Sequence, residues 1–275
     1  MTGDAEVSAF DTSVANPARI WNYWLGGKDN FEADREAAEK VLEVIPSMRL
    51  LARLARAQLI DAVRQLAGEF GIRQFLDIGT GLPTASNTHE VAQALAPESR
   101  IVYVDNDPVV ICHAQALLTS SPQGRTDYLH ADLRDTAEIL AGAGKTLDLS
   151  QPVAVLLIGV LHFIPDADEP HAVVARLMAA LPPGSFLAIG HGASDIQADV
   201  VPEMTRRYNQ RASASLTLRS RPEVTRFFDG LELIDPGVVP LSQWRRGNWR
   251  DVPAAAPGQV LGYCGIARKP PADQG

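Results

Sequence analysis

The chain has 275 residues, of which 46% are hydrophobic and 21% charged, and this composition excludes wholesale disorder. The formal net charge of −8 weighs against a broad basic face, so neither a nucleic-acid partner nor a membrane partner is expected. Cys112 and Cys264 form no metal-ligand spacing, and no His/Asp cluster indicates a metal. The sequence has no signal-peptide pattern and no bilayer-length apolar run, which predicts a cytoplasmic location.

The first 71 residues predict helices. A short helix is expected over residues 19–25, where isoleucine, tryptophan and leucine form one stripe. A second helix should begin in a capping box of Asp29 and Glu32. A third is expected over residues 51–70, where apolar residues recur three or four positions apart. Its arginines lie mostly off that stripe and are expected to face solvent: Arg49, Arg53, Arg56 and Arg64.

Beyond residue 71, short β-rich runs alternate with helical runs. The predicted strands are residues 74–78, 100–104, 127–130, 153–158, 185–189, 231–234 and 262–267. Asn87 and Glu90 are expected to cap the helix after the first strand. This alternation predicts an α/β fold with a doubly wound, Rossmann-like, mostly parallel sheet. Ligands of such sheets bind beyond the carboxyl ends of the strands, so functional residues are sought there.

Three acidic residues follow three consecutive strands. The first strand ends in DIGTG, residues 77–81, whose two glycines let the backbone turn sharply, but the third glycine of a dinucleotide motif is absent. Asp77 can face a cationic amine, and Asp105 stands where a carboxylate accepts hydrogen bonds from ribose hydroxyls. Asp132 follows the third strand, within reach of an adenine amine. A ligand with ribose, adenine, a cationic amino-acid tail and no phosphate fits this set, and S-adenosylmethionine is such a ligand.

These motifs resemble a known family. The Asp-x-Gly-x-Gly string, the acid ending the second strand and the later Ala-Asp-Leu resemble the class I S-adenosylmethionine-dependent methyltransferases over residues 72–269. The string PARIWNYWLGGKDNF at residues 17–31, together with residues 77–84 and 104–108, resembles the actinobacterial S-adenosyl methyltransferase family, formerly a domain of unknown function. The resemblance implies a seven-stranded sheet with one antiparallel strand and an N-terminal helical cap. It implies no particular methyl acceptor.

The resemblance also divides the chain and assigns a cofactor site. The expected parts are a tail and helical cap (1–71), a methyltransferase domain (72–269) and a C-terminal tail (270–275). Pro83 stands where many class I members have a third glycine, so the shape of the following loop is left open. The predicted cofactor-binding residues are Asp77, Gly79, Thr80, Gly81, Asp105, Asn106, Asp132, Leu133 and Gly159.

Candidate catalytic and acceptor-binding residues come from two regions. His162 follows the fourth strand and His191 the fifth, where a general base could meet the acceptor, although each could equally be a hydrogen-bonded turn residue. The N-terminal aromatics suggest either a lid that shapes an acceptor pocket or a helix anchored on the sheet by tryptophans. The polar insertion at residues 195–219 is expected to cover the acceptor site. The predicted substrate-binding residues are Tyr23, Trp24 and Lys28.

The sequence therefore predicts an S-adenosylmethionine-dependent methyltransferase that acts on a small molecule. A non-catalytic S-adenosylmethionine-binding or regulatory protein is an alternative, because no general base is unambiguous. An NAD(P)-dependent oxidoreductase is a second alternative, which the missing third glycine disfavours. The run WRRGNWR at residues 244–250 interleaves basic and aromatic residues as nucleic-acid sites do, but in this acidic chain a surface loop is expected.

Overall fold

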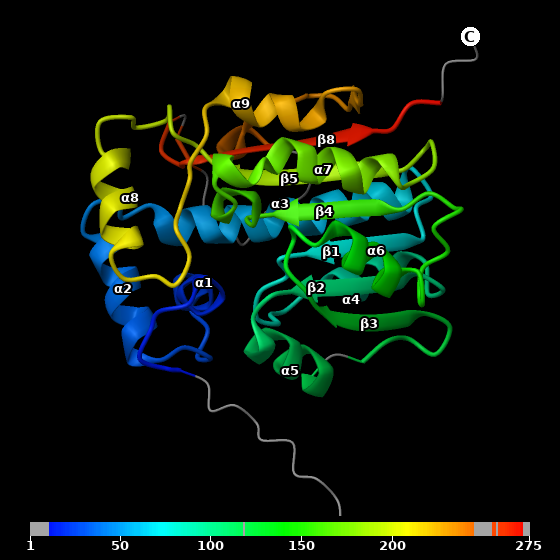
Figure 1. The fold of residues 1–275 in the computed structure, drawn as a ribbon, viewed down its shortest axis with the longest axis horizontal. Helices are drawn as coiled ribbons and strands as arrows, with labels where there is room; N and C mark the ends of the chain where they lie inside the picture. The colour runs from blue at the N-terminus through cyan, green and yellow to red at the C-terminus, as the bar shows by residue number, and fades with distance from the viewer. Residues whose placement is uncertain (1–10, 118, 245–254, 257, 272–275) are drawn as a thin grey trace, which may run out of the picture.

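The computed structural model describes residues 11–271 except 118, 245–254 and 257. Most of the WRRGNWR run therefore lies outside the described residues. The strands within these described residues form a central eight-stranded sheet with the order β3-β2-β1-β4-β5-β8-β6, and β7 pairs with β8 (Figure 1). The strands are β1 (Gln74–Ile78), β2 (Arg100–Asp105), β3 (Arg125–His130), β4 (Ala154–Ile158), β5 (Phe186–Gly192), β6 (Glu232–Leu233), β7 (Val239–Pro240) and β8 (Gly262–Arg268).

The pairing of the strands confirms the predicted fold class. Strands β1 to β5 pair in parallel, and β8 runs antiparallel to β5. Strands β6 and β7 pair only with β8, both antiparallel. The two-residue strand β7 makes the count eight where the resemblance implied seven. The carboxyl ends of β1 to β5 therefore share one edge of the sheet, where a doubly wound fold binds its ligands.

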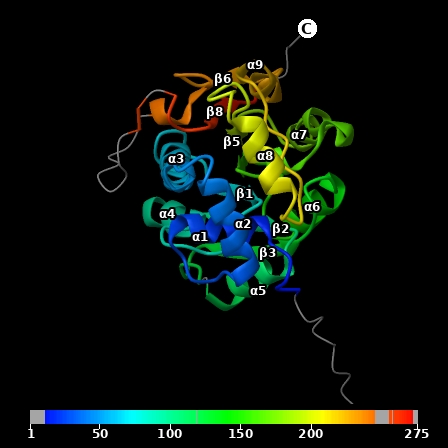
Figure 2. The ribbon, with the colours of Figure 1, turned by 90° about the vertical axis from the view of Figure 1, so that its left-hand side faces the viewer.

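Helices cover both faces of the sheet. They are α1 (Pro17–Leu25), α2 (Glu32–Leu42), α3 (Met48–Gly68), α4 (Thr88–Leu95), α5 (Pro108–Leu117), α6 (Thr136–Ala143), α7 (Pro170–Ala179), α8 (Val201–Asn209) and α9 (Arg221–Thr225). Figure 2 shows α3 and α4 on one side of the strands and α6 and α7 on the other. The helices and the sheet enclose a hydrophobic core on each face. Phe75 packs in one core and Leu76 in the other, because successive side chains of a strand point to opposite faces. No helix in the described part of the chain is long and apolar enough to cross a membrane.

Two predicted helix starts have different outcomes. The capping box before α4 is present, since the Asn87 backbone N–H donates to Glu90 Oε2 at 2.7 Å. The prediction of a capping box formed by Asp29 and Glu32 is wrong, because α2 begins at Glu32 and Phe31 is its N-cap residue. There the Phe31 backbone N–H donates to Asp34 Oδ2 at 2.8 Å. Asp34 takes the capping role because its buried carboxylate lies one turn into the helix.

Helices α1, α2 and α8 gather beyond the carboxyl ends of the parallel strands, on the left of Figure 1. Buried Arg19 of α1 pairs with Asp34 of α2 at 2.8 Å. Arg207 of α8 pairs with Glu43, just after α2, also at 2.8 Å. The cap is thus built from the N-terminal segment and from the β5–β6 insertion. Helix α3 instead packs on the sheet, so the hydrophobic core runs across the division predicted at residue 71.

Candidate functional site

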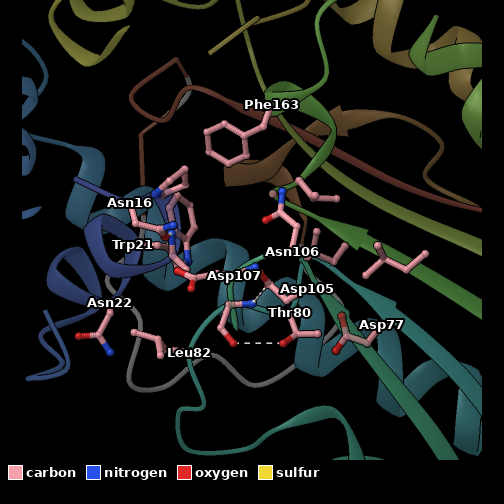
Figure 3. A pocket seen from close by; sticks show the side chains of 18 of the residues that line it. Asn16, Trp21, Asn22, Asp77, Thr80, Leu82, Asp105, Asn106, Asp107 and Phe163 are labelled. Carbon is pink, nitrogen blue, oxygen red and sulfur yellow. Dashed lines mark hydrogen bonds between the residues drawn. The ribbon is translucent and has the colours of Figure 1, made fainter. Parts of the chain in front are cut away.

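A cavity of about 160 Å³ lies at the carboxyl ends of β1, β2 and β4, with α1 along one side (Figure 3). The turn after β1 can approach the loop after β4 because Gly79 has no side chain. Its φ is +72°, and a Cβ there would lie 2.5 Å from Val160 Cβ. At Gly79 the DIGTG string therefore brings backbone, rather than side chain, to the wall of the cavity.

Two buried carboxylates face this cavity. Asp105 Oδ2 accepts a hydrogen bond from the Gly81 backbone N–H at 2.9 Å, and its Oδ1 accepts one from Asp107 N–H at 2.9 Å. Asp77 Oδ2 accepts a hydrogen bond from Thr88 Oγ1 at 2.6 Å. Burial raises the pKa of Asp77 to about 6, and it does the same for Asp105 against the opposing effect of its backbone hydrogen bonds. Both groups are ionised at neutral pH and have oxygen lone pairs left for a ligand.

Arg56 of α3 also lines this cavity. Its Nη2 donates to the carbonyl oxygens of Ala85 and Ser86 at 3.1 and 2.9 Å, whereas its buried Nε has no hydrogen-bond partner among the described residues. Burial lowers the pKa of Arg56, and the negative charge of Asp77 opposes that shift. The prediction that Arg56 faces solvent is wrong, because the loop before α4 folds back over this part of α3.

The cavity collects the predicted cofactor-binding residues with one exception. Its lining includes Asp77, Gly79, Thr80, Gly81, Asp105, Asn106, Leu133 and Gly159. Asp132 is not among the lining residues, since its two oxygens each accept a 2.8 Å hydrogen bond from the Arg134 guanidinium. Arg134 lowers the pKa of Asp132 to about 2. Asn106 Nδ2 donates to Asp132 Oδ2 at 3.4 Å, so the contact of Asp132 with the cavity runs through Asn106.

These groups fit S-adenosylmethionine. The ligand carries a ribose diol, an ammonium and a carboxylate, and the cavity offers two buried carboxylates and an arginine Nε that lacks a partner. Arg56 was not predicted to bind the cofactor, because an arginine on a helix surface usually faces solvent. Trp21 lines the cavity but was not in the predicted substrate-binding set, although it belongs to the N-terminal aromatic string.

A second cavity, of about 60 Å³, adjoins the first. Both cavities are lined by Pro17, Trp21, Ala55, Gly159 and Phe163. Met204 and Tyr208 of α8 line the second cavity, followed by Leu216 and Leu218. The β5–β6 insertion therefore covers this cavity, and its role over an acceptor site stays a prediction.

Both candidate catalytic histidines line the second cavity. His191 Nδ1 is 2.8 Å from the Gly192 carbonyl oxygen and its Nε2 is 3.0 Å from Arg219 Nη1, so both ring nitrogens have partners. Burial lowers the pKa of His191 to about 4. His162 is buried, and its Nδ1 has no hydrogen-bond partner among the described residues. Burial, with the positive charge of Arg219 nearby, holds the pKa of His162 well below its usual value, so the ring is neutral.

Of the three predicted substrate-binding residues, one lines a cavity and two do not. Trp24 is buried and lines the second cavity. The Tyr23 hydroxyl hydrogen-bonds to Glu39 and Arg49, and Lys28 is exposed. In the described part of the chain, neither Tyr23 nor Lys28 lines either cavity. Among the described residues, no group of three or more His, Cys, Asp or Glu side chains could hold a metal ion.

The parallel sheet with one antiparallel strand and a cofactor cavity at its carboxyl edge defines the class I methyltransferases. The profile of the S-adenosyl methyltransferase family matches residues 4–270, and the chain belongs to this family. A DUF574 family protein from Streptomyces avermitilis is 43% identical with a TM-score of 0.90, over 94% of this chain and 99% of that chain. A candidate methyltransferase from Thermobifida fusca is 40% identical with a TM-score of 0.85, over 94% of this chain and 97% of that chain.

More distant structures share the fold alone. The plantazolicin methyltransferase BpumL, solved in complex with SAH, is 13% identical with a TM-score of 0.51, over 91% of this chain and 94% of that chain. No curated protein matches the chain. Family membership confirms that the chain is an S-adenosylmethionine-dependent methyltransferase with S-adenosylmethionine as its cofactor, and it does not favour the oxidoreductase or the non-catalytic alternative.

Proposed function

We propose that the larger cavity holds S-adenosylmethionine through three charged side chains. Asp105 accepts hydrogen bonds from the ribose hydroxyls, Asp77 faces the ammonium group, and Arg56 faces the carboxylate. The observation that carries this assignment is the arrangement of two buried carboxylates and one half-buried guanidinium, whose buried Nε has no partner among the described residues, around a single cavity. When bound, S-adenosylmethionine supplies a methyl group on a sulfonium ion, and an acceptor atom takes this methyl as the S–C bond breaks and its electron pair stays on sulfur.

The adenine end is assigned to the cavity wall formed by Asn106 and Leu133. Asp132 acts on that wall as a positioning residue, because it accepts a hydrogen bond from the Asn106 amide and is itself held by Arg134. Its direct contact with adenine stays a prediction.

We further propose a small-molecule acceptor that enters beneath the helical cap. The second cavity adjoins the first and is closed by α1 and α8, which leaves room for a compact group rather than for a nucleic-acid strand. Holding the acceptor beside the cofactor can supply several kcal/mol of the barrier reduction, on the order of what positioning contributes in other enzymes. The cytoplasmic location stays a prediction.

Calorimetric titration with S-adenosylhomocysteine tests the cofactor site. Asp105→Ala should weaken binding by about tenfold to a thousandfold, since hydrogen bonds to a charged group are each worth roughly 1.5–3 kcal/mol. Asp127→Ala is the matched control, because Asp127 lies on β3 and lines neither cavity among the described residues. Unchanged affinity in a folded Asp105→Ala protein would overturn the assignment.

A further inference from the structure

The smaller cavity has walls without charge. Among its described lining residues there is no aspartate, glutamate, lysine or arginine. The walls are mainly aromatic and aliphatic: Trp21, Trp24, Phe163, Tyr208, Met48, Met204, Leu51, Leu216, Leu218, Leu241 and Leu261. Moving an ionised group from water into such surroundings is costly unless an opposite charge meets it. The lining therefore selects an acceptor whose buried end is uncharged.

The polar side chains of this cavity differ in what they can still bind. Both ring nitrogens of His191 have partners, and the Tyr263 hydroxyl donates to Asp195 at 2.9 Å. His162 Nδ1 has no partner among the described residues, although the residue is only 7% exposed. A buried nitrogen without a partner destabilises the fold, and a bound hydrogen-bonding group would remove that cost.

His162 also lies where the acceptor must react. Gly159 lines both cavities, and a Cβ on Gly159 would lie 3.9 Å from His162 Cε1. The imidazole therefore borders the passage between the cofactor cavity and the apolar cavity. The apolar cavity, at about 60 Å³, is smaller than the roughly 150 Å³ cavity that accommodates benzene in an engineered protein, so the group it takes is compact.

We infer that this cavity takes the reacting end of an uncharged, apolar small molecule that bears a hydroxyl group, and that His162 Nδ1 accepts the hydrogen bond of that hydroxyl. The inference rests on the proposed function. A hydroxyl that donates to Nδ1 keeps its oxygen lone pairs for the methyl carbon. In the transfer, one lone pair forms the C–O bond, the S–C electron pair stays on sulfur, and the hydroxyl proton passes to His162 Nδ1 and then to solvent.

The neutral state of His162 agrees with this role. A neutral imidazole with its proton on Nε2 presents Nδ1 as an acceptor. The low pKa makes His162 a weak base before reaction. An oxygen that has gained the methyl group is a far stronger acid than an imidazolium ion, so the proton can still move to Nδ1 late in the step.

Ligand-observed NMR titration of the full chain, saturated with S-adenosylhomocysteine, tests the inference with four small probes. Butan-1-ol and 1-methoxypropane have the same number of heavy atoms, but only the alcohol donates a hydrogen bond. Butyrate and butylammonium add a charge of either sign. Butan-1-ol should bind about tenfold or more tightly than either ion and about fivefold more tightly than the ether.

Two variants assign the preference to His162. His162→Leu should abolish the preference for the alcohol over the ether, whereas His162→Asn, whose amide lies near the position of Nδ1, should restore most of it. The inference would be overturned if either ion bound as tightly as butan-1-ol, or if the alcohol and the ether bound equally. It would also be overturned if the alcohol did not bind, or if the preference for the alcohol survived His162→Leu. Failure of S-adenosylhomocysteine to bind the unmodified chain would instead contradict the proposed function.

Discussion

The two cavities share five lining residues, including Trp21 and Phe163, yet the larger one is lined by charged side chains and the smaller one, among the described residues, is not. The larger one gathers acidic side chains from the ends of strands and a guanidinium from α3. The smaller one gathers apolar side chains from α1, α3 and α8 and from Leu261, just before β8. Strand ends open into loops, where polar groups are tolerated, while the helices of a cap present apolar stripes. A charged cofactor and an uncharged acceptor can therefore be bound side by side.

Helix α1 lines both cavities, and a buried ion pair holds it in place. Arg19 pairs with Asp34 at 2.8 Å, and its Nη1 lies 3.9 Å from Asp107 Oδ2 beside the cofactor loop. Both cavities thus depend on the same anchoring of α1, and variants that act on one cavity alone are needed to separate them.

After Asp105→Ala, the largest effect is expected from Arg56→Gln. This change removes the positive charge from the cofactor cavity, and affinity for S-adenosylhomocysteine should fall by about tenfold to a hundredfold, as expected for losing a hydrogen bond to a charged group. Arg53→Gln on the same helix is the control, because Arg53 is exposed and should leave affinity unchanged. Calorimetry measures both, and equal affinities in the two variants would contradict the role given to Arg56.

An intermediate effect is expected from pH. The pKa values of Asp77 and Asp105 are raised to about 6, so both carboxylates lose their charge as the pH falls from 7 to 5. Affinity for S-adenosylhomocysteine should then fall by about tenfold for each carboxylate that the ligand needs in its ionised form, because one pH unit below the pKa roughly nine tenths of the molecules carry that carboxyl protonated. Calorimetry at both pH values measures this, and a flat profile would contradict the assignment of these two carboxylates.

The raised pKa values of Asp77 and Asp105 also affect the stability of the folded protein at low pH, so unfolding must be distinguished from lost affinity. Unfolded aspartate titrates near pH 4, so between pH 6 and 4 the folded protein binds more protons than the unfolded chain. These two groups therefore increase the free energy of unfolding as the pH falls. Burial lowers the pKa values of His162 and His191, and this acts in the opposite sense below about pH 6.5, so the melting temperature of the cofactor-free protein should change little between pH 7 and 5. A retained melting temperature separates lost affinity from lost structure.

The smallest effect is expected from Lys28→Ala. The sequence placed Lys28 in the substrate-binding set, but its side chain is exposed and, in the described part of the chain, lines neither cavity. Affinity for S-adenosylhomocysteine and for butan-1-ol should change less than about twofold, as for most surface substitutions. A larger loss of butan-1-ol binding would show that the acceptor reaches beyond the apolar cavity.

The polar half of the site was predictable from the sequence because its residues follow strands in fixed order. Asp77 is the last residue but one of β1 and Asp105 ends β2, and parallel pairing brings the carboxyl ends of these strands together. Arg56 was not predictable, because it enters the cavity through the packing of α3 against the loop before α4. The pairing of His191 with Arg219 was equally hidden, since 28 positions separate them and only the folded insertion joins them.

A crystal structure of the chain with S-adenosylhomocysteine tests the division between the two cavities most directly. We expect ribose oxygens on Asp105, the homocysteine carboxylate on Arg56, and the sulfur beside Gly159, facing the cavity that His162 lines. A nucleoside bound away from Asp105, or a sulfur turned away from the apolar cavity, would contradict this division.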